Sequence, residues 1–360
     1  KERLEEVRAG QMERGEKPRY DRKCVGRTEG EPGVTPVIRF HNPDGGVVAW
    51  DDRVRGRVEI SNDELDDLII WRSDDNPTYN FVVVVDDIDM KITDVIRGDD
   101  HVGNTPRQIN LYRALGVEPP SFAHLPMIHG SDGGKLSKRH GAVSVMQYQE
   151  AGYLPEAMVN YLARLGWSHG DDELFTLEKM VQWFDGTHLA KSPAQWDPAK
   201  LAWVNAHHLK QAADGRLAAL LQQRLVARGI VVDDLALLER AAALFKERCT
   251  TLVDLADWAA MLFVPVSPAA EDLAAQVTAV VKPALPTLRD KLAVAAWDKA
   301  GIAAAMKETL AAHQLKMPQL APAVRVLVCG RVQTPSIDAV LALFPREAVL
   351  ARLQGAENLV

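Results

Sequence analysis

Hydrophobic and polar positions divide the chain into a mixed first part and a helical second part. In residues 1–78 an opening helical pattern, "KERLEEVRAGQMERGE", precedes the short β-type runs "TPVIRF", "NPDGGVVAW" and "GRVEIS". Pro, Asp and Gly separate these runs, which predicts a small antiparallel sheet with a tight turn at residues 44–46. From Val143 onward almost every segment has apolar residues at helical spacing.

The segment between these parts has the pattern of a nucleotide-binding domain. The continuous apolar run "YNFVVVVDD", residues 79–87, predicts a strand buried on both faces, and "KITDVIRGDDH" predicts a second strand that leads into a polar loop. "NTPRQINLYRALG" predicts a helix that begins near Pro106 and ends at Gly116, and "AHLPMIHG" predicts a returning strand. This order is half of a doubly wound α/β domain, in which ligands bind at the carboxyl ends of the strands.

Composition and charge narrow the class of protein. The chain has 360 residues, with 47% hydrophobic and 25% charged residues and a net charge of −7, which is ordinary for a globular protein of two or three domains. No run approaches 18 apolar residues and no leader pattern opens the sequence, so we expect a cytoplasmic protein without a membrane partner. A stretch without acidic residues, 309–337, could bind a polyanion despite the overall sign.

The candidate chemistry begins with "GGKLSKRHG", residues 133–141, a basic loop opened by a glycine pair. Lys135, Leu136, Ser137, Lys138 and Arg139 fit the pattern K-x-S-K-[RS]. A loop that closes over a phosphate is one interpretation, and a solvated surface loop is the other. Its position directly after a returning strand of a nucleotide-type domain favours the phosphate interpretation.

The motifs in this region resemble a known family. "KLSKR" resembles the KMSKS motif of class I aminoacyl-tRNA synthetases. "PTYNFVVVVDDIDMKITDVIRGDDHVGNTPRQ", "KLSKRHGAVSVMQY" and "VNYLARLGWSHGD" are similar to bacterial glutamyl-tRNA synthetases, and the resemblance continues along nearly the whole chain. It implies that L-glutamate and ATP with Mg²⁺ form glutamyl-adenylate, from which the glutamyl group passes to tRNA(Glu). The Mg²⁺ would be held largely by phosphates and water.

The resemblance also implies a domain organisation, with a monomer as the expected assembly. The fold class is an α/β Rossmann-type catalytic half-domain, 79–129, with an inserted α+β acceptor-stem domain, 1–78. A helical stem-contact domain with the KLSKR loop, 130–214, and an all-α anticodon-binding domain, 215–360, complete the chain. Glutaminyl enzymes differ by C-terminal β-barrels, and the tRNA-modifying paralogue lacks an anticodon domain, whereas residues after Gly215 here are helical in pattern.

The resemblance assigns ATP contacts to the basic loop and to the loop after the second strand. Lys135 and Lys138 are the implied catalytic residues, because cations on a closing loop stabilise the charge that develops on the transferring phosphate. Lys138, Leu136, Asp100 and His101 are the implied ATP-binding residues. A histidine in such a loop more often makes routine polar contacts than special ones.

Tyr79 and Arg97 match the glutamate-binding positions of the family. An arginine fork grips a carboxylate, and a tyrosine hydroxyl adds a directed hydrogen bond. Without the resemblance, Tyr79 would be a half-buried strand aromatic and Arg97 a surface partner of Asp99 or Asp100. Which carboxylate of glutamate each residue meets is left open by the sequence.

The anticodon contacts implied by the resemblance lie in the C-terminal half. "VRVLVCGRVQTPSIDAV" supplies Arg325, Arg331, Thr334 and Pro335, and Arg248 matches a position linked to the third anticodon base. Splayed anticodon bases are read by hydrogen bonds and by stacking on arginine or aromatic planes, so arginine suits this role. Arginine on a helix surface for solubility is the alternative. Contacts at the third base would also decide whether tRNA for glutamine is charged.

Two departures from the family pattern stand out. No segment matches the His-x-Gly-His motif of class I enzymes, so we expect that motif, with another glutamate-binding arginine, to precede Lys1. The alternative is a non-catalytic tRNA-binding fragment. Cys24 lacks the neighbouring ligands with which some relatives bind zinc, and Cys249 and Cys329 lie far from it, so we expect neither zinc nor a disulfide. No other metal site is expected.

Overall fold

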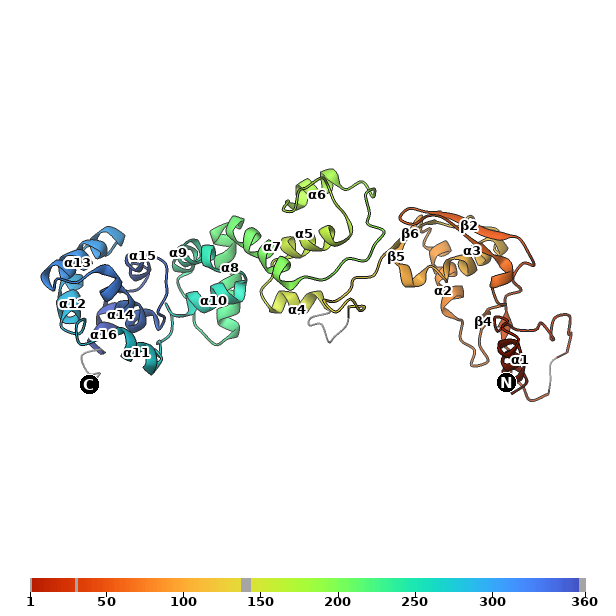
Figure 1. Cartoon of the computed structure of the whole chain (residues 1–360), viewed down its shortest axis with the longest axis horizontal. Coiled ribbons are helices and arrows are strands. Elements are labelled where there is room, and N and C mark those ends of the chain that lie inside the picture. Colours follow the sequence, from red (N-terminus) through yellow and green to blue (C-terminus); the bar gives the residue numbers. More distant parts are fainter. Residues whose placement is uncertain (1, 30–31, 137–143, 356–360) are drawn as a thin grey trace. The chain divides into compact units, whose positions relative to one another are not determined.

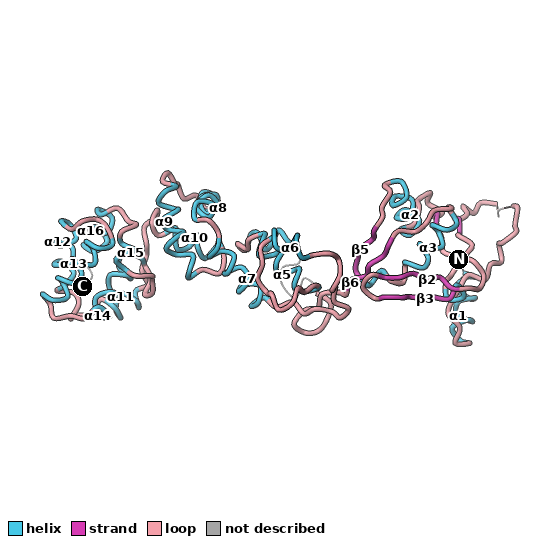
Figure 2. The backbone as a smooth tube through the Cα atoms, turned by 90° about the horizontal axis from the view of Figure 1, so that it is seen from above, coloured by secondary structure: helices cyan, strands magenta, loops and turns pink. Residues whose placement is uncertain are grey.

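The strands lie in the first third of the chain, and the later residues are mainly helical. The computed structural model describes residues 2–29, 32–136 and 144–355 (Figure 1). In these residues all strands precede residue 126, and Figure 2 shows them confined to that part of the chain. Two compact units are present: Lys1–His140 with Leu162–Trp196, and Gly141–Tyr161 with Asp197–Val360. None of the helices in the described part of the chain has the length and apolar character needed to cross a membrane.

Short two-stranded ladders hold the first unit, and they differ from the single antiparallel sheet expected. β1 pairs with β4 and β2 with β3, both antiparallel, whereas β5 and β6 are parallel. The expected turn at residues 44–46 is a bend, with positive φ at Gly45 and Gly46, but it joins strands of different ladders. The hairpin turn is at residues 53–55, where the Asp52 carboxylate accepts the amides of Val54 and Arg55. Within the described ranges the strands are β1 (Ile38–Arg39), β2 (Val47–Asp52), β3 (Gly56–Ser61), β4 (Ile69–Trp71), β5 (Asp94–Gly98) and β6 (Ser121–Leu125).

The expected strand at residues 79–87 is wrong, because this segment forms helix α2 (Tyr79–Asp89). Phe81, Val84 and Ile88 follow one another at helical spacing and join the core of the unit. The run of four valines hides that spacing, since buried strands and buried helices share continuous apolar sequence. Asp87, expected at a strand end, lies on this helix, and its carboxylate accepts a hydrogen bond from the Tyr112 hydroxyl at 3.0 Å.

The remaining elements of the first unit agree with the pattern. Helix α3 (Thr105–Ala114) has a proline in its first turn, as expected, and connects β5 to the parallel strand β6. The core joins β2, α2, α3 and β6 through Trp50, Val84, Ile109, Tyr112 and Phe122. Complete burial of such side chains contributes about 1.5–3 kcal/mol each. Further elements are α1 (Glu2–Glu13), α6 (Leu177–Trp183) and the 3₁₀ turns η1 (Asn62–Glu64) and η2 (Asp99–His101).

An aromatic cluster organises residues 162–196 of this unit. The buried Trp167 meets Phe175 and Phe184 edge-on, with ring centroids 6.0 and 5.5 Å apart. The rings of His169 and Trp183 are stacked at 4.2 Å, and Trp183 also meets Phe175 edge-on. Edge-on and offset pairs of this kind add stabilisation beyond the area they bury.

The described residues of the second unit form helices joined by loops and contain no strand, as the apolar pattern predicts. Aspartates accept backbone amides at the starts of several helices, for example Asp197 before α7 and Asp234 before α9. The proline-containing segments also mark helix starts, with Pro283 just before α12. The helices are α4 (Val145–Glu150), α5 (Pro155–Gly166, shared with the first unit), α7 (Pro198–Gln211), α8 (Asp214–Ala227), α9 (Leu235–Phe245), η4 (Lys246–Arg248), α10 (Leu252–Ala260), α11 (Ala270–Gln276), α12 (Ala284–Val294), α13 (Lys299–Ala312), α14 (Met317–Cys329), α15 (Ile337–Leu341) and α16 (Arg346–Gly355).

Candidate active site and tRNA-contact region

Residues at the carboxyl end of β5 lie beside the start of α2. Tyr79 is the first residue of α2, and its hydroxyl lies 3.4 Å from Nδ1 of His101 in η2. Its side chain is exposed, so the hydroxyl can reach a ligand. β5 ends at Gly98, where an added Cβ would lie 2.7 Å from Asp100 Oδ1 and 3.2 Å from Met127 Sδ, so the ends of these side chains would have to move. The structure therefore brings Tyr79 and His101 together.

Arg97 is half-buried in β5 next to this pair and is held by polar side chains. Its Nη2 atom donates to Thr105 Oγ1 and Gln108 Oε1, both at 2.8 Å. Its Nε atom donates to His124 Nε2 at 3.2 Å. Burial lowers the pKa of Arg97, and the neighbouring Tyr79 opposes this shift. An arginine remains charged in such surroundings, so the strand end presents a fixed positive group.

Arg97 is not the ion-pair partner of Asp99 or Asp100, which was the alternative interpretation of this residue. Asp99 is paired with Arg55 at 2.7 Å, and Asp100 with Lys135 at 3.3 Å. The hydrogen bond with Lys135 is the main cause that lowers the pKa of Asp100. The two acidic side chains after β5 therefore have other cationic partners.

Two buried residues that the sequence analysis did not select lie behind Arg97. His124 on β6 and Asp52 at the end of β2 are joined by a 2.5 Å contact between Nδ1 and Oδ2, and both side chains are fully buried. Burial opposes ionisation of Asp52, but hydrogen bonds from the Arg55 amide, the His124 side chain and nearby amides outweigh it and lower the pKa of Asp52 to about 2. Burial lowers the pKa of His124 against the pull of Asp52, so the imidazole is neutral at neutral pH.

The basic loop begins in a tight turn that follows β6. The amide of Gly130 donates to the carbonyl of Gly134 at 2.8 Å, and the amide of Leu136 donates to the carbonyl of Ile128 at 2.9 Å. The turn directs Lys135 to Asp100, one of the residues to which the resemblance assigns ATP contacts. Lys138, with Ser137 and Arg139, lies outside the described residues.

Of the candidate anticodon residues, three form one small cluster at α14. The Nε atom of Arg325 donates to the Thr334 hydroxyl at 3.1 Å, and that hydroxyl donates to the carbonyl of Pro335 at 2.8 Å. Thr334 and Pro335 are buried, whereas Arg325 is half-buried. The threonine therefore orients the arginine and has its hydroxyl engaged within the protein.

A second group of contacts joins Arg331 to the segment that leads into Arg248. The guanidinium of Arg331 lies over the ring of Trp258, 4.4 Å from its centroid, and donates to the Asp257 carbonyl at 3.0 Å. The Trp258 ring stacks on Phe245, which immediately precedes the turn η4 that ends at the exposed Arg248. A cation above an aromatic face is held in a defined plane. Arg331 can therefore offer that plane to a base.

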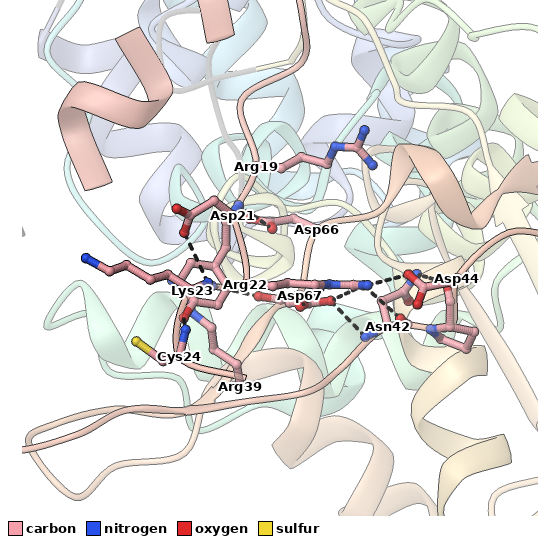
Figure 3. A network of polar contacts seen from close by, with 12 residues as sticks. Arg19, Asp21, Arg22, Lys23, Cys24, Arg39, Asn42, Asp44, Asp66 and Asp67 are labelled. Atoms are coloured by element: carbon pink, nitrogen blue, oxygen red, sulfur yellow. Dashed lines mark hydrogen bonds and ion pairs between the residues drawn. The ribbon is translucent and has the colours of Figure 1, made fainter. Parts of the chain in front are cut away.

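Cys24 lies beside a polar network centred on Arg22 (Figure 3). The thiol is exposed, and the backbone amide of Cys24 donates to the Tyr20 hydroxyl at 3.0 Å. Arg22 makes a two-point contact with the buried Asp67, both bonds being 2.8 Å. In the stretches of chain that can be described, no group of three or more His, Cys, Asp or Glu side chains is arranged to hold a metal ion.

Comparison with known proteins places these sites in a family. The family described as "tRNA synthetases class I (E and Q), catalytic domain" matches residues 1–203, and the "Anticodon binding domain" matches residues 216–357. A glutamate–tRNA ligase of Paracidovorax citrulli is 60% identical over 360 residues, covering 98% of this chain and 75% of the relative. One from Leptothrix cholodnii is 58% identical over 362 residues, covering 98% of this chain and 76% of the relative.

Solved structures agree with this result. A glutamate tRNA ligase of Elizabethkingia meningosepticum, crystallised in complex with its amino acid, has a TM-score of 0.83 at 26% identity and covers 99% of this chain and 77% of its own. A glutamate–tRNA synthetase of Elizabethkingia anophelis has a TM-score of 0.78, also at 26% identity, with the same coverage. The chain belongs to the class I aminoacyl-tRNA synthetases, with a catalytic domain and an anticodon-binding domain. Within that class, it is a member of the glutamate–tRNA ligase family.

Proposed function

We propose that this chain attaches L-glutamate to tRNA(Glu) with ATP, through a glutamyl-adenylate intermediate. The observation that carries the proposal is the convergence of Tyr79, Arg97 and His101 at the carboxyl end of β5. Lys135 of the basic loop reaches the same strand end through Asp100. No specific observation favours the alternative of a non-catalytic tRNA-binding fragment.

The proposed domains keep the boundaries that the family resemblance implies. Residues 1–78 form the inserted acceptor-stem domain and 79–129 the second half of the Rossmann-type catalytic domain. Residues 130–214 form the stem-contact domain, and 215–360 the all-α anticodon-binding domain. The enzyme works as a cytoplasmic monomer, and the Mg²⁺ that accompanies ATP is held mainly by phosphates and water.

In the proposed site, Arg97 and Tyr79 bind glutamate. The positive guanidinium attracts a carboxylate, and the exposed Tyr79 hydroxyl adds a directional hydrogen bond. His101 and Asp100 contact ATP, and Leu136 lies at the start of the loop that covers it. In this proposal Tyr79 and Arg97 form the amino-acid subsite, and Asp100 and His101 belong to the nucleotide subsite next to it.

Lys135 and Lys138 act on the phosphates. When glutamate attacks the α-phosphate, negative charge grows on the phosphate oxygens, and fixed cations stabilise that state more than the ground state. The ion pair between Lys135 and Asp100 is exposed and therefore weak, so ATP phosphates can displace the carboxylate at small cost.

The tRNA is proposed to meet the second unit at its arginines. Arg248 is exposed at the end of η4, and Arg331 is held flat by Trp258, so both can contact splayed anticodon bases. Arg325 is supported from behind by Thr334 and Pro335. Aminoacylation of purified tRNA(Glu) and tRNA(Gln) by wild type and Arg248→Ala measures how far Arg248 determines the choice between them.

The proposed activity is tested with Lys138→Ala in the full-length enzyme. Loss of a donor that acts in the transition state lowers kcat of aminoacylation by about 10²- to 10³-fold. Lys91→Ala is the matched control, because this exposed lysine precedes β5 and so lies at the opposite end of the strand. Near-normal aminoacylation by Lys138→Ala would contradict the assignment of the loop.

The amino-acid subsite is tested separately with Arg97→Gln. Loss of a charge-assisted hydrogen bond raises KM for glutamate by roughly 10- to 10²-fold, while KM for ATP stays within about twofold. An unchanged KM for glutamate would remove Arg97 from the subsite without affecting the proposal for the loop.

A further inference from the structure

We propose that Asp52 and His124 are positioning residues for glutamate recognition, which act by fixing the direction of the Arg97 guanidinium. The inference rests on the proposed role of Arg97 as a glutamate-binding residue. Neither Asp52 nor His124 would touch the substrate, because both side chains are fully buried behind β5. Their contribution is to leave Arg97 a single plane in which to meet a carboxylate.

The strand register brings the three residues together. Arg97 and His124 are direct partners in the parallel ladder of β5 and β6. Asp52 comes from the end of β2, and its Oδ1 atom accepts the backbone amide of His124 at 3.2 Å. Three elements that are distant in sequence therefore build one chain of contacts from carboxylate to imidazole to guanidinium.

Three of the five N–H groups of Arg97 are taken up in this arrangement. Nε donates to His124 Nε2, and Nη2 donates to Thr105 Oγ1 and Gln108 Oε1. These contacts leave the two N–H groups of Nη1 for other acceptors, since a guanidinium has a rigid fork of five donors. A flexible side chain on a β-strand has thereby been restricted to one orientation before a ligand arrives, which reduces the entropy lost on binding.

The tautomer of His124 is what makes this orientation possible. A carboxylate only accepts hydrogen bonds, so Asp52 Oδ2 requires the proton on His124 Nδ1. In the neutral imidazole the other nitrogen, Nε2, is then an acceptor, which is what the donor Arg97 Nε needs. The Thr105 hydroxyl also lies 3.0 Å from Nε2. If the proton moved to Nε2, Thr105 Oγ1 could accept it, but the N–H of Arg97 Nε would then face a donor instead of an acceptor. Asp52 therefore determines, through the imidazole tautomer, whether His124 Nε2 can accept a hydrogen bond from Arg97 Nε.

The competing explanation is that Asp52 only stabilises the fold. The structural role and the positioning role can be distinguished, because they use different oxygens of the carboxylate. Oδ1 accepts the amides of Val54 and Arg55, both at 3.0 Å, and so stabilises the hairpin turn. Oδ2 faces His124 Nδ1 and, at 3.4 Å, the Trp50 indole. Asp52→Asn can retain the carbonyl oxygen at the turn while placing an N–H donor against Nδ1. The substitution reverses the imidazole tautomer and leaves the turn its acceptor.

The first experiment measures aminoacylation by full-length Asp52→Asn with glutamate varied at saturating ATP and tRNA. We expect KM for glutamate to rise about tenfold, with KM for ATP within about twofold of wild type. Asp67→Asn is the matched control, because Asp67 is also a buried carboxylate of the first unit but lies in the Arg22 network. Equal kinetic effects of the two substitutions, or an unchanged KM for glutamate in Asp52→Asn, would overturn the proposal.

A second pair of variants decides the matter even if Asp52→Asn does not fold. His124→Gln can place an amide oxygen near the position of Nε2, where it accepts from Arg97, whereas the shorter His124→Asn can only replace Nδ1. We expect His124→Gln to retain a KM for glutamate several-fold closer to wild type than that of His124→Asn. Equal values, or the reverse order, would overturn the proposal.

The result for Arg97→Gln separates this inference from the proposed function. If Arg97→Gln raises KM for glutamate and the Asp52 and His124 variants do not, the positioning role fails while the glutamate subsite stands. If Arg97→Gln itself leaves KM for glutamate unchanged, the proposed glutamate subsite is contradicted, and the positioning role falls with it. Isothermal titration of glutamate into each variant gives the same comparison without catalysis.

Discussion

Arg22→Ala tests whether one ion pair holds the segment around Cys24 to the body of the first unit. Arg22 has a left-handed backbone, with φ of 57°, and its guanidinium grips both oxygens of Asp67 at 2.8 Å (Figure 3). It also contacts Asp44 and the carbonyl of Asn42. Asp67 is only 3% exposed at its side chain, so it depends on this partner. Alanine keeps a Cβ, so the backbone strain at this position is unchanged by the substitution.

The expected cost is set by the burial of Asp67. Removing one member of a buried ion pair costs about 3–5 kcal/mol, because the remaining charge is left unpaired. Arg22 is 31% exposed at its side chain, so water can reach Asp67 once the guanidinium is gone, and the lower end of that range applies. The expected local destabilisation is about 3 kcal/mol. The double variant Arg22→Ala with Asp67→Asn should lose less than the two single variants together, since no charge is stranded.

Hydrogen exchange of single amides measures this destabilisation where it occurs. The amide of Asn42 donates to Asp67 Oδ1 at 2.9 Å, and the amide of Tyr20 donates to Asp66 Oδ1 at 2.9 Å. Protection of these amides should fall by about 10²-fold in Arg22→Ala, since each factor of ten corresponds to about 1.4 kcal/mol. Arg14→Ala is the control, because Arg14 pairs with Glu16 at the surface and such pairs contribute little to stability. Unchanged protection in Arg22→Ala would refute the reasoning.

Buried groups give two further predictions. Burial raises the pKa of Cys249 and of Cys329 to about 12 each, whereas Cys24 is exposed. Iodoacetamide at pH 8 should therefore label Cys24 well before the other two, as read by peptide mass spectrometry, and early labelling of Cys329 would be evidence against its burial. Burial also lowers the pKa of His124 below its usual 6.5, so below that pH the unfolded chain binds a proton that the folded chain does not. The free energy of unfolding of the first unit should consequently fall as pH drops below about 6.5, by at most about 1.4 kcal/mol per pH unit. Urea titrations at pH 7.5 and 5.5 measure this slope, and an equal slope in His124→Gln would exclude His124 as its source.

The sequence predicts helices with clear boundaries better than strands in short ladders. Helix α3 has a proline in its first turn and a glycine shortly after its end, and both signals hold in the structure. Helix α2 lacks such contrast, because four consecutive valines look the same in a buried strand. The spacing of Phe81, Val84 and Ile88 is the signal that would have identified the helix. The β2–β3 hairpin has no strong turn signal, because its turn, "RVR", contains no Asn-Gly or Asp-Gly pair.

Some residues of the candidate site can be identified from the sequence, and others cannot for a physical reason. Tyr79, Arg97 and His101 lie within motifs that resemble a family, so the sequence selects them as site residues, and the structure brings their side chains close together. Their roles toward ligands stay predictions.

Asp52 and His124 carry no comparable signal, because they are 72 residues apart and each becomes informative only when β2, β5 and β6 are assembled. In the sequence, Asp52 is one of several acidic residues before a turn and therefore looks like a solvated charge. Folding converts it into the buried acceptor that selects an imidazole tautomer. A positioning role of this kind depends on strand register, so it can be inferred only after the fold is known.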